Sequence, residues 1–549
     1  MKETLSAQQP REQISQEVGA RRGVRVLLFL LAVASFVLFS IPNAKASEDL
    51  AMVQVFEPDE SAEFPTISNM AKPKGDFVTF VKQFIVYERY NKGLPFYGPS
   101  ALLLVFLRWV GLDGNYPAAF LVLRQAISVL PMLCGLLLLV WLQDRFRTYR
   151  SVLLFLFLLV VPAVVQNGFW WHPDGLTLLL SVLVLWLLYK DELRFGSNFY
   201  WAAAVCGVLT AAKTVGIFFF LTVAVVLIWG LLEKRITPGK AALLALKFIG
   251  VMAAAFLLSS PFLFSKWGRA GYLNMMRAQM FSLSSGYGVV YAKGLAAAWP
   301  LMHTYFGSAP FLLASLGLCV YGIAANKARY LNALILTWFI PLTLYVTVFS
   351  HFKYQYWLPV ALPLLSCWAS VFPEKIRAFK LKGWRGVVWA GLALLFLAQF
   401  FLFAQQSQRM FTDRVRRADD NPYIHFSETA ARSLAPLGSA PLRVYYDYRL
   451  YVPEKPGWQL STAYVPLSYS QVSENNFDVL LLAEQRVRDY LNPAVKGVDP
   501  ALFAESQRFY RDVERGSVEG FSFLGGDAAG RVFIRHELCK QYFPEAPCD

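Results

Sequence analysis

The densest group of reactive side chains in this sequence lies just after its first apolar run: Glu57, Asp59 and Glu60, with Glu63 close behind. Neighbouring carboxylates raise one another's proton affinity, so one of them can be tuned toward a general base. A carboxylate can also hold a cation that neutralises developing charge. A solvated acidic loop is the simpler local interpretation. Asp59 and Glu60 are therefore candidate catalytic residues, and Glu57 is a candidate substrate-binding residue.

A second group lies in the sequence NGFWWHPDG, which contains Trp170, Trp171, His172 and Asp174. Aromatic faces beside a histidine and a carboxylate suit a sugar ring, which has an apolar face and hydrogen-bonding edges. An aromatic belt, followed by an aspartate that caps the next helix, explains the same residues without a ligand. His172 and Asp174 are candidate substrate-binding residues.

Two further segments place cations where an anion could bind. In TAAKTVG, Lys213 stands between two apolar runs, where a charge is costly and suggests a function such as holding a phosphate leaving group. In SHFKYQYWLP, the candidates are His351, Lys353 and Tyr354. Snorkelling of Lys213 and an interfacial Tyr/Trp/Lys anchor are the alternatives.

The elements that must position these residues are membrane helices. The chain has 549 residues, of which 56% are hydrophobic and 16% charged, which is too apolar for a water-soluble protein of this length. Apolar runs near or above the roughly 18-residue threshold predict about eleven spans. We expect them at 24–41, 116–142, 151–166, 175–189, 199–213, 215–232, 240–260, 301–324, 330–349, 357–372 and 386–405.

Basic residues orient these spans. The formal net charge is +15, but the lysines and arginines lie in short loops and no nucleic-acid motif is present, so we expect no nucleic-acid partner. The basic groups at 21–25, 145–150, 190–194, 234–240, 327–329 and 375–385 all fall on one side, which the positive-inside rule makes cytoplasmic. The candidate site residues then all lie on the opposite face of the membrane. Lys353 is a positive charge on this face, where the positive-inside rule predicts few. This convergence carries more weight than any single motif.

The first span is expected to be an uncleaved anchor, although its end, IPNAKAS, has the small-residue spacing of a signal-peptidase site. An odd number of spans places the C-terminus outside. A disulfide between Cys539 and Cys548 would suit that oxidising compartment.

The predicted fold class is mainly α: a polytopic transmembrane helical bundle with a small C-terminal α/β domain. Residues 1–405 would form the transmembrane catalytic domain, with large periplasmic loops at 42–115 and 261–300, and residues 406–549 the periplasmic domain. In the first loop we expect interfacial helices, with Tyr87, Tyr90, Phe96, Tyr97 and Trp109 at headgroup depth. In the tail we expect strands at 442–452 and 477–483, a helix at 484–491 and a strand pair at 520–536.

This layout resembles the glycosyltransferase C superfamily, particularly bacterial relatives of protein O-mannosyltransferases and of lipid A aminoarabinose transferases. The shared features are a first span, the Asp59-Glu60 pair in the first outer loop, a segment like YGPSALLL, a later outer aspartate, a lysine after the fifth span and a periplasmic tail.

The resemblance implies an inverting transfer from an undecaprenyl-phosphate-linked sugar to a periplasmic lipid, glycan or protein, in the bacterial inner membrane. Asp59 would be the base or would orient the acceptor, Glu60 would support it, and Lys213 would bind the donor phosphate. His172 and Asp174 would line the donor or acceptor pocket. Some members use a divalent metal and others do not, and no ligand set in the sequence decides this.

Two other functions fit a polytopic chain. A transporter also has many spans and intramembrane charges, but transporters favour inverted repeats and midplane charges, whereas here the charges gather outside and the halves do not match. A lipid-linked polysaccharide polymerase or ligase would share the lipid-linked substrate but take a glycan as donor.

Overall fold

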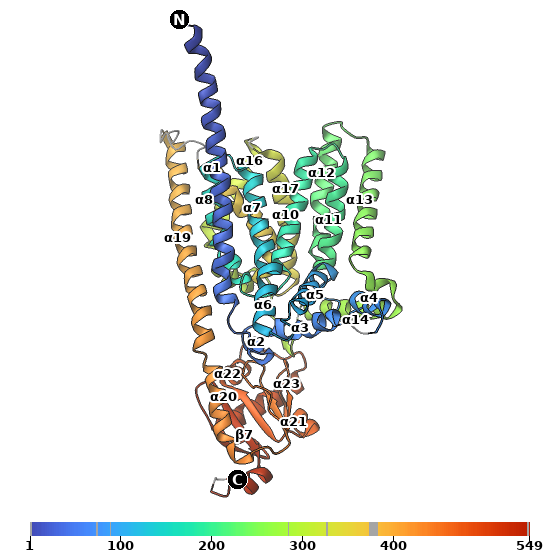
Figure 1. The fold of residues 1–549 in the computed structure, drawn as a ribbon, viewed down its shortest axis with the longest axis vertical. Helices are drawn as coiled ribbons and strands as arrows, with labels where there is room; N and C mark the ends of the chain where they lie inside the picture. The colour runs from blue at the N-terminus through green and yellow to red at the C-terminus, as the bar shows by residue number, and fades with distance from the viewer. Residues whose placement is uncertain are drawn as a thin grey trace.

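The protein is a helical membrane protein with a small mixed domain at one end (Figure 1). The computed structural model describes residues 3–72, 75–87, 89–283, 285–325, 328–372, 383–545 and 548, with side chains from residue 21 onward except at 385. The expected cytoplasmic charges at 327 and 375–382 lie outside the described residues.

Within the described residues, six helical stretches are long and apolar enough to cross a membrane, and a seventh if one bent pair is a single span. The six are Arg21–Asn43, Tyr116–Asp144, Thr214–Leu232, Pro238–Leu258, Arg329–Phe349 and Gly386–Ser433. The expected spans at 151–166, 175–189, 199–213 and 357–372 are also helical, but their helices are shorter, interrupted or more charged.

Every expected span falls on helices of the bundle. These are α1 (Glu3–Asn43), α6 (Tyr116–Leu123), η1 (Arg124–Val129), α7 (Leu130–Asp144), α8 (Tyr149–Leu159), α9 (Pro162–Asn167), α10 (Asp174–Asp191), α11 (Ser197–Ala212), η2 (Thr214–Phe219), α12 (Phe220–Leu232), α13 (Pro238–Leu258), α15 (Leu295–Phe306), α16 (Ala309–Ala324), α17 (Arg329–Leu344), η4 (Tyr345–Phe349), α18 (Tyr354–Ser366), η5 (Cys367–Val371) and α19 (Gly383–Asp419).

The span expected at 301–324 is bent, because α15 and α16 meet at an angle of 82°. Gly307 at this corner has φ +110°, a backbone conformation that side-chain-bearing residues rarely adopt, and Pro310 follows at the start of α16. The span expected at 151–166 is likewise divided into α8 and α9, with Pro162 opening the second helix.

The interior of the bundle is packed with large apolar side chains, including fully buried Trp338 and Trp368. The outer helices α1, α13 and α19 instead leave most of their apolar residues uncovered by protein. A helix that is apolar toward its surroundings needs lipid rather than water around it.

Short helices cross the end of the bundle that faces the C-terminal domain (Figure 1). They are α2 (Leu50–Phe56), α3 (Pro58–Ala71), α4 (Phe77–Ile85), α5 (Leu94–Trp109), η3 (Pro261–Phe264) and α14 (Lys266–Ser282). As expected of an interfacial helix, α4 buries none of its side chains and leaves Phe77 78% exposed.

Three of the aromatic residues expected at headgroup depth, Tyr87, Phe96 and Tyr97, are buried in protein and so do not contact the surroundings. They pack with Phe64 and Trp171 in a core beneath α3 and α5. Trp109, at the end of α5, is 82% exposed and fits the expectation. Sequence pattern alone could not separate these aromatic residues, because protein and headgroups both accept them.

The C-terminal domain has a five-stranded sheet with strand order β4-β3-β5-β7-β6. Strands β4, β3 and β5 are parallel, and β7 runs antiparallel to both β5 and β6. The elements are α20 (Pro422–Ser433), η7 (Ala435–Leu437), β3 (Leu442–Tyr446), β4 (Trp458–Ser461), α21 (Tyr469–Asn475), β5 (Val479–Ala483), α22 (Glu484–Leu491), α23 (Pro500–Arg515), β6 (Phe521–Gly526), β7 (Gly530–Arg535) and α24 (His536–Tyr542).

The strands predicted at 477–483 and 520–536 and the helix at 484–491 are confirmed, whereas the strand predicted at 442–452 ends at Tyr446. Elements β4, α20, α21, α23 and α24 were not anticipated. The Cys539–Cys548 disulfide is present. Helix α19 continues to Asp419, past residue 406 where we expected the domain to begin, and connects the bundle to the domain (Figure 1).

Candidate functional site

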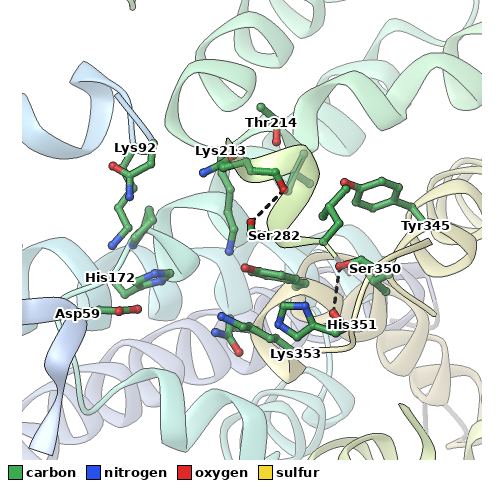
Figure 2. Close-up of a pocket in the computed structure, with 18 of the residues that line it drawn as sticks. Asp59, Lys92, His172, Lys213, Thr214, Ser282, Tyr345, Ser350, His351 and Lys353 are labelled. Carbon is green, nitrogen blue, oxygen red and sulfur yellow. Dashed lines mark hydrogen bonds between the residues drawn. The ribbon is translucent and has the colours of Figure 1, made fainter. Parts of the chain in front are cut away.

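A cavity of about 400 Å³ opens at the end of the bundle nearest the C-terminal domain. Among the predicted site residues, it is lined by Asp59, His172, Lys213, His351 and Lys353, which come from distant parts of the chain and converge on one space (Figure 2).

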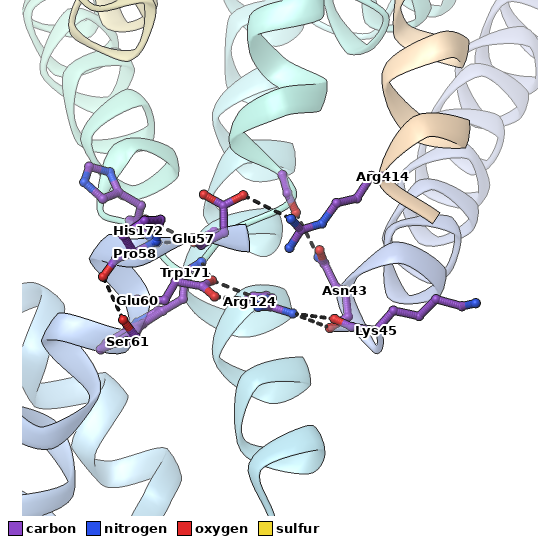
Figure 3. Close-up of polar contacts among 12 residues, drawn as sticks. Asn43, Lys45, Glu57, Pro58, Glu60, Ser61, Arg124, Trp171, His172 and Arg414 are labelled. Atoms are coloured by element: carbon purple, nitrogen blue, oxygen red, sulfur yellow. Dashed lines mark hydrogen bonds and ion pairs between the residues drawn. The ribbon is translucent and has the colours of Figure 1, made fainter. Parts of the chain in front are cut away.

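Glu60, on the first turn of α3, is fully buried and does not line this cavity. Its carboxylate accepts hydrogen bonds from Arg124 Nε at 2.9 Å and Nη2 at 2.5 Å, and from the backbone N–H of Trp171 (Figure 3). Arg124 Nη1 also donates to the backbone oxygens of Asn43 and Lys45 at 3.0 and 3.1 Å. Glu60 therefore ties α3 to α1, to η1 and to the segment that carries His172.

Two other acids of the cluster are also engaged. Glu57 Oε1 lies 3.3 Å from Arg414 Nη1 of α19 (Figure 3). Burial raises the pKa of Glu57 to about 7 although Arg414 opposes the shift. Glu63 accepts hydrogen bonds from Asn91 at 3.2 Å and from the Tyr97 hydroxyl, and pairs with Lys92 at 3.2 Å. Burial acts to raise the pKa of Glu63, but Lys92 and these hydrogen bonds hold it below its usual value.

Asp59 differs from its neighbours. It is exposed, it lines the cavity, and it makes no hydrogen bond or ion pair with any other residue that the structure describes. Pro58 opens α3, so Asp59 lies in the first helical turn, beside the free N–H groups that favour a carboxylate. The carboxylate oxygens of Asp59 are thus free to accept a proton from a bound molecule.

Lys213 lies where the chain breaks between α11 and η2. Its backbone is extended, and Gly216 packs against α11 so closely that a Cβ there would lie 2.4 Å from the Cys206 carbonyl oxygen. The Lys213 Nζ lies 2.5 Å from Asp174 Oδ1, while His172 Nδ1 contacts the other oxygen of Asp174. Asp174 lies behind the cavity wall and links the two residues.

His172 is buried and stacks on Trp170 with a ring separation of 4.2 Å. Burial lowers the pKa of His172 to about 4, although Asp174 opposes this shift. The imidazole is therefore neutral at pH 7. Because Asp174 can only accept when ionised, His172 donates from Nδ1, which leaves Nε2 as an acceptor.

Another part of the cavity wall comes from the segment before α18 and from the first turn of α18. The Tyr356 ring has Lys213 Nζ at 4.5 Å and Lys353 Nζ at 5.7 Å from its centre. Lys353 forms no ion pair with any described residue. Burial and Lys353 lower the pKa of His351 to about 4. Two buried cavity-lining atoms, His351 Nδ1 and Gln355 Oε1, have no hydrogen-bond partner within the described chain. These groups are available to a ligand.

Tyr354 does not line the cavity. It stacks on Tyr305 of α15 at 4.0 Å, and Tyr356 occupies the wall instead. Sequence reasoning also missed Lys92 and Gln279, which line the same space. No sequence signal distinguishes Lys92, because six other lysines and arginines lie in the same outer loop. Gln279 carries no signal either.

Within the described ranges, no group of three or more His, Cys, Asp and Glu side chains is arranged to hold a metal ion. In the acidic cluster, Glu57, Glu60 and Glu63 each face an arginine or lysine. Of these four acids, only Asp59 lacks a partner among the residues described.

No protein-family model matches the sequence, and neither does any curated protein. Solved structures with a similar course of the chain include ArnT from Cupriavidus metallidurans bound to undecaprenyl phosphate, with 12% identity and a TM-score of 0.49 over 93% of this chain and 98% of that one. The archaeal oligosaccharyltransferase AglB from Archaeoglobus fulgidus, in complex with an inhibitory peptide and a dolichol-phosphate, has 11% identity and a TM-score of 0.49 over 84% and 69%.

Both are membrane glycosyltransferases with the glycosyltransferase C fold, the superfamily that the sequence resembles.

Proposed function

We propose that this protein is a membrane glycosyltransferase that moves a sugar from a polyprenyl-phosphate carrier, such as undecaprenyl phosphate, to an acceptor outside the bacterial inner membrane. The observation that carries the proposal is the Asp59 carboxylate, which has no hydrogen-bond or ion-pair partner within the described ranges and lies in a cavity that also presents Lys213 and Lys353. A general base and cations for a phosphate leaving group are the two requirements of this transfer.

The reaction is a single displacement with inversion. The acceptor oxygen or nitrogen forms a bond to the anomeric carbon, and the bond from that carbon to the carrier phosphate breaks. Asp59 takes the proton from the acceptor, and the carrier phosphate leaves with the electron pair. Lys213 and Lys353 stabilise the charge on that phosphate as it grows.

Other residues hold these groups in place. Glu60 fixes the first turn of α3 through Arg124, and so positions Asp59. Asp174 fixes the Lys213 ammonium, with His172 on its other oxygen. Glu57 pairs with Arg414, so its proposed part in binding is to shape the region next to Asp59.

An apolar part of the cavity wall favours a lipid-linked donor. Val215, Phe218, Leu342 and Val346 line the same space as the lysines. Such a wall suits the first isoprene units of a carrier whose phosphate lies between the cations. A nucleotide sugar would leave this surface uncovered.

The proposal includes the expected topology of about eleven spans, a cytoplasmic N-terminus and a periplasmic C-terminal domain. The cavity then opens outside the cytoplasm, where nucleotide sugars are absent and sugars arrive on lipid carriers.

The test is transfer from labelled undecaprenyl-phosphate sugars by purified protein, with a cell-envelope extract as the acceptor source. We expect Asp59→Asn to lower turnover by about 100- to 10,000-fold, the usual contribution of a general base. Folding should be unaffected, because Asp59 has no partner to lose in the part of the chain that the structure describes. Glu48→Gln, a change of an exposed acid of the same outer loop that lines neither this cavity nor its neighbour, is the matched control, and it should retain most of the activity.

Wild-type turnover by Asp59→Asn would reject Asp59 as the base. Absence of release by wild type from any of several lipid-linked sugars would reject the transferase and favour a transporter or a glycan polymerase.

A further inference from the structure

We propose that the C-terminal domain forms half of a binding site for the acceptor, and that the acceptor group bound there is a saccharide without excess negative charge. This inference rests on the proposed function and names its acceptor class. A second cavity, of about 420 Å³, lies between the bundle and the C-terminal domain. Its size is within the range of pockets that enclose a small ligand.

The two cavities meet at the proposed base. Asp59, Tyr287 and Tyr464 line both of them. A base in a transfer reaction must reach the acceptor while the acceptor reaches the donor's anomeric carbon. A carboxylate shared by two cavities meets this requirement, with the donor in the cavity that holds the lysines and the acceptor in the other.

The second cavity is walled by aromatic side chains from both parts of the protein. Trp170 comes from the bundle, and Tyr448, Tyr464 and Tyr490 come from the C-terminal domain. The Tyr448 and Tyr464 ring centres are 4.8 Å apart. Aromatic faces with polar edges suit a sugar ring, which has apolar C–H faces and hydroxyl groups around its rim.

The charges of this cavity exclude a preference for phosphate. Arg449 and Asp489 both line it and have opposite signs. Arg486 also lines it but faces the buried Asp447 at 3.6 Å and lies under the rings of Tyr448 and Tyr490, 4.9 and 4.8 Å from their centres. With Asp59 at its edge, the cavity has no excess positive charge for a phosphate or an acidic sugar.

A hairpin fixes the two cavities to each other. Strands β1 (Ser285–Gly286) and β2 (Val289–Val290) carry Tyr287 and, just beyond, Tyr291. Val290 N–H donates to the Lys496 oxygen at 2.8 Å, so the hairpin is bonded to the C-terminal domain. On its other side, the Tyr291 ring packs on His351 at 4.3 Å. The acceptor cavity is therefore built onto the wall of the donor cavity.

The experiment uses the full-length protein in nanodiscs and saturation-transfer NMR with methyl glucoside, methyl galactoside and diacetylchitobiose as probes. A threonine-containing peptide and inorganic phosphate are the competing ligand classes. We expect at least one sugar to bind wild type, and Tyr448→Ala to weaken that binding about tenfold, as expected when an aromatic stacking surface is removed. Asp489→Asn, which preserves the side-chain shape, should weaken it as well.

The matched controls are Tyr469→Ala and Asp512→Asn, in the same domain but outside both cavities. These should bind the sugars as wild type does. Binding of the peptide but none of the sugars, binding of phosphate alone, or no binding of any probe sugar would overturn the inference. Equal sugar binding by wild type and both cavity variants would overturn it too.

Transfer assays separate this inference from the proposed function. In one outcome, wild type binds a sugar, Tyr448→Ala loses that binding, and wild type consumes no lipid-linked donor. This outcome would support the saccharide site and reject the transferase. Donor-dependent transfer with an unchanged acceptor KM in Tyr448→Ala and Asp489→Asn would support the transferase and reject the site.

Discussion

Removing the ammonium of Lys213 should weaken donor binding far more than acceptor binding. The side chain is 17% exposed, lines the cavity, and lies over the Tyr356 ring. In Lys213→Ala, the carrier phosphate loses one charge-assisted hydrogen bond, which is worth about 1.5–3 kcal/mol. The dissociation constant for undecaprenyl phosphate should therefore rise about 10- to 150-fold.

The same substitution also removes the cation beside Asp174, whose side chain is only 2% exposed. Lys213→Arg keeps a positive charge beside Asp174, so it separates the loss of the phosphate contact from the effect on Asp174. The Lys213→Arg protein should bind the carrier more tightly than the Lys213→Ala protein. Lys45→Ala is the matched control, because Lys45 Nζ pairs with Asp419 at 2.6 Å and lies outside both cavities. It should leave donor affinity unchanged.

The assay is equilibrium binding of radiolabelled undecaprenyl phosphate to purified protein in nanodiscs, with the thermal unfolding midpoint measured on each variant. An unchanged dissociation constant in Lys213→Ala would refute phosphate binding and leave Lys213 as an interfacial anchor. Equal losses of donor and acceptor affinity, with a lower midpoint, would show that the substitution disturbs the fold instead.

Cys539 and Cys548 should resist alkylation in the native protein until a reductant is added, and free labelling of both would contradict the disulfide. Arg124→Ala should lower the free energy of unfolding by about 3–5 kcal/mol, because it leaves the fully buried Glu60 carboxylate without its partner. A thermal midpoint equal to that of wild type would show that Glu60 is not held by this ion pair.

The amino-acid sequence by itself determined the helices of the bundle and several elements of the C-terminal domain. A helix in lipid must satisfy its backbone hydrogen bonds internally, so long apolar runs have few other structures available. The strand β5 and the helix α22 were also predictable, because the apolar run that ends at Ala483 gives way at Glu484 to a segment rich in charged residues. The disulfide partners were the two cysteines of the polar tail.

Only the tertiary structure decided which acid of the cluster is free. Glu57, Asp59, Glu60 and Glu63 lie within a few residues of one another, and local sequence treats them alike. The arginine that neutralises Glu60 lies 64 residues away, and the one beside Glu57 lies 357 residues away. Likewise, Tyr356 lines the cavity in place of the predicted Tyr354, whose ring stacks on Tyr305 of α15. Side-chain pairing across the fold depends on which helices touch, and helix contacts are not encoded in any single segment.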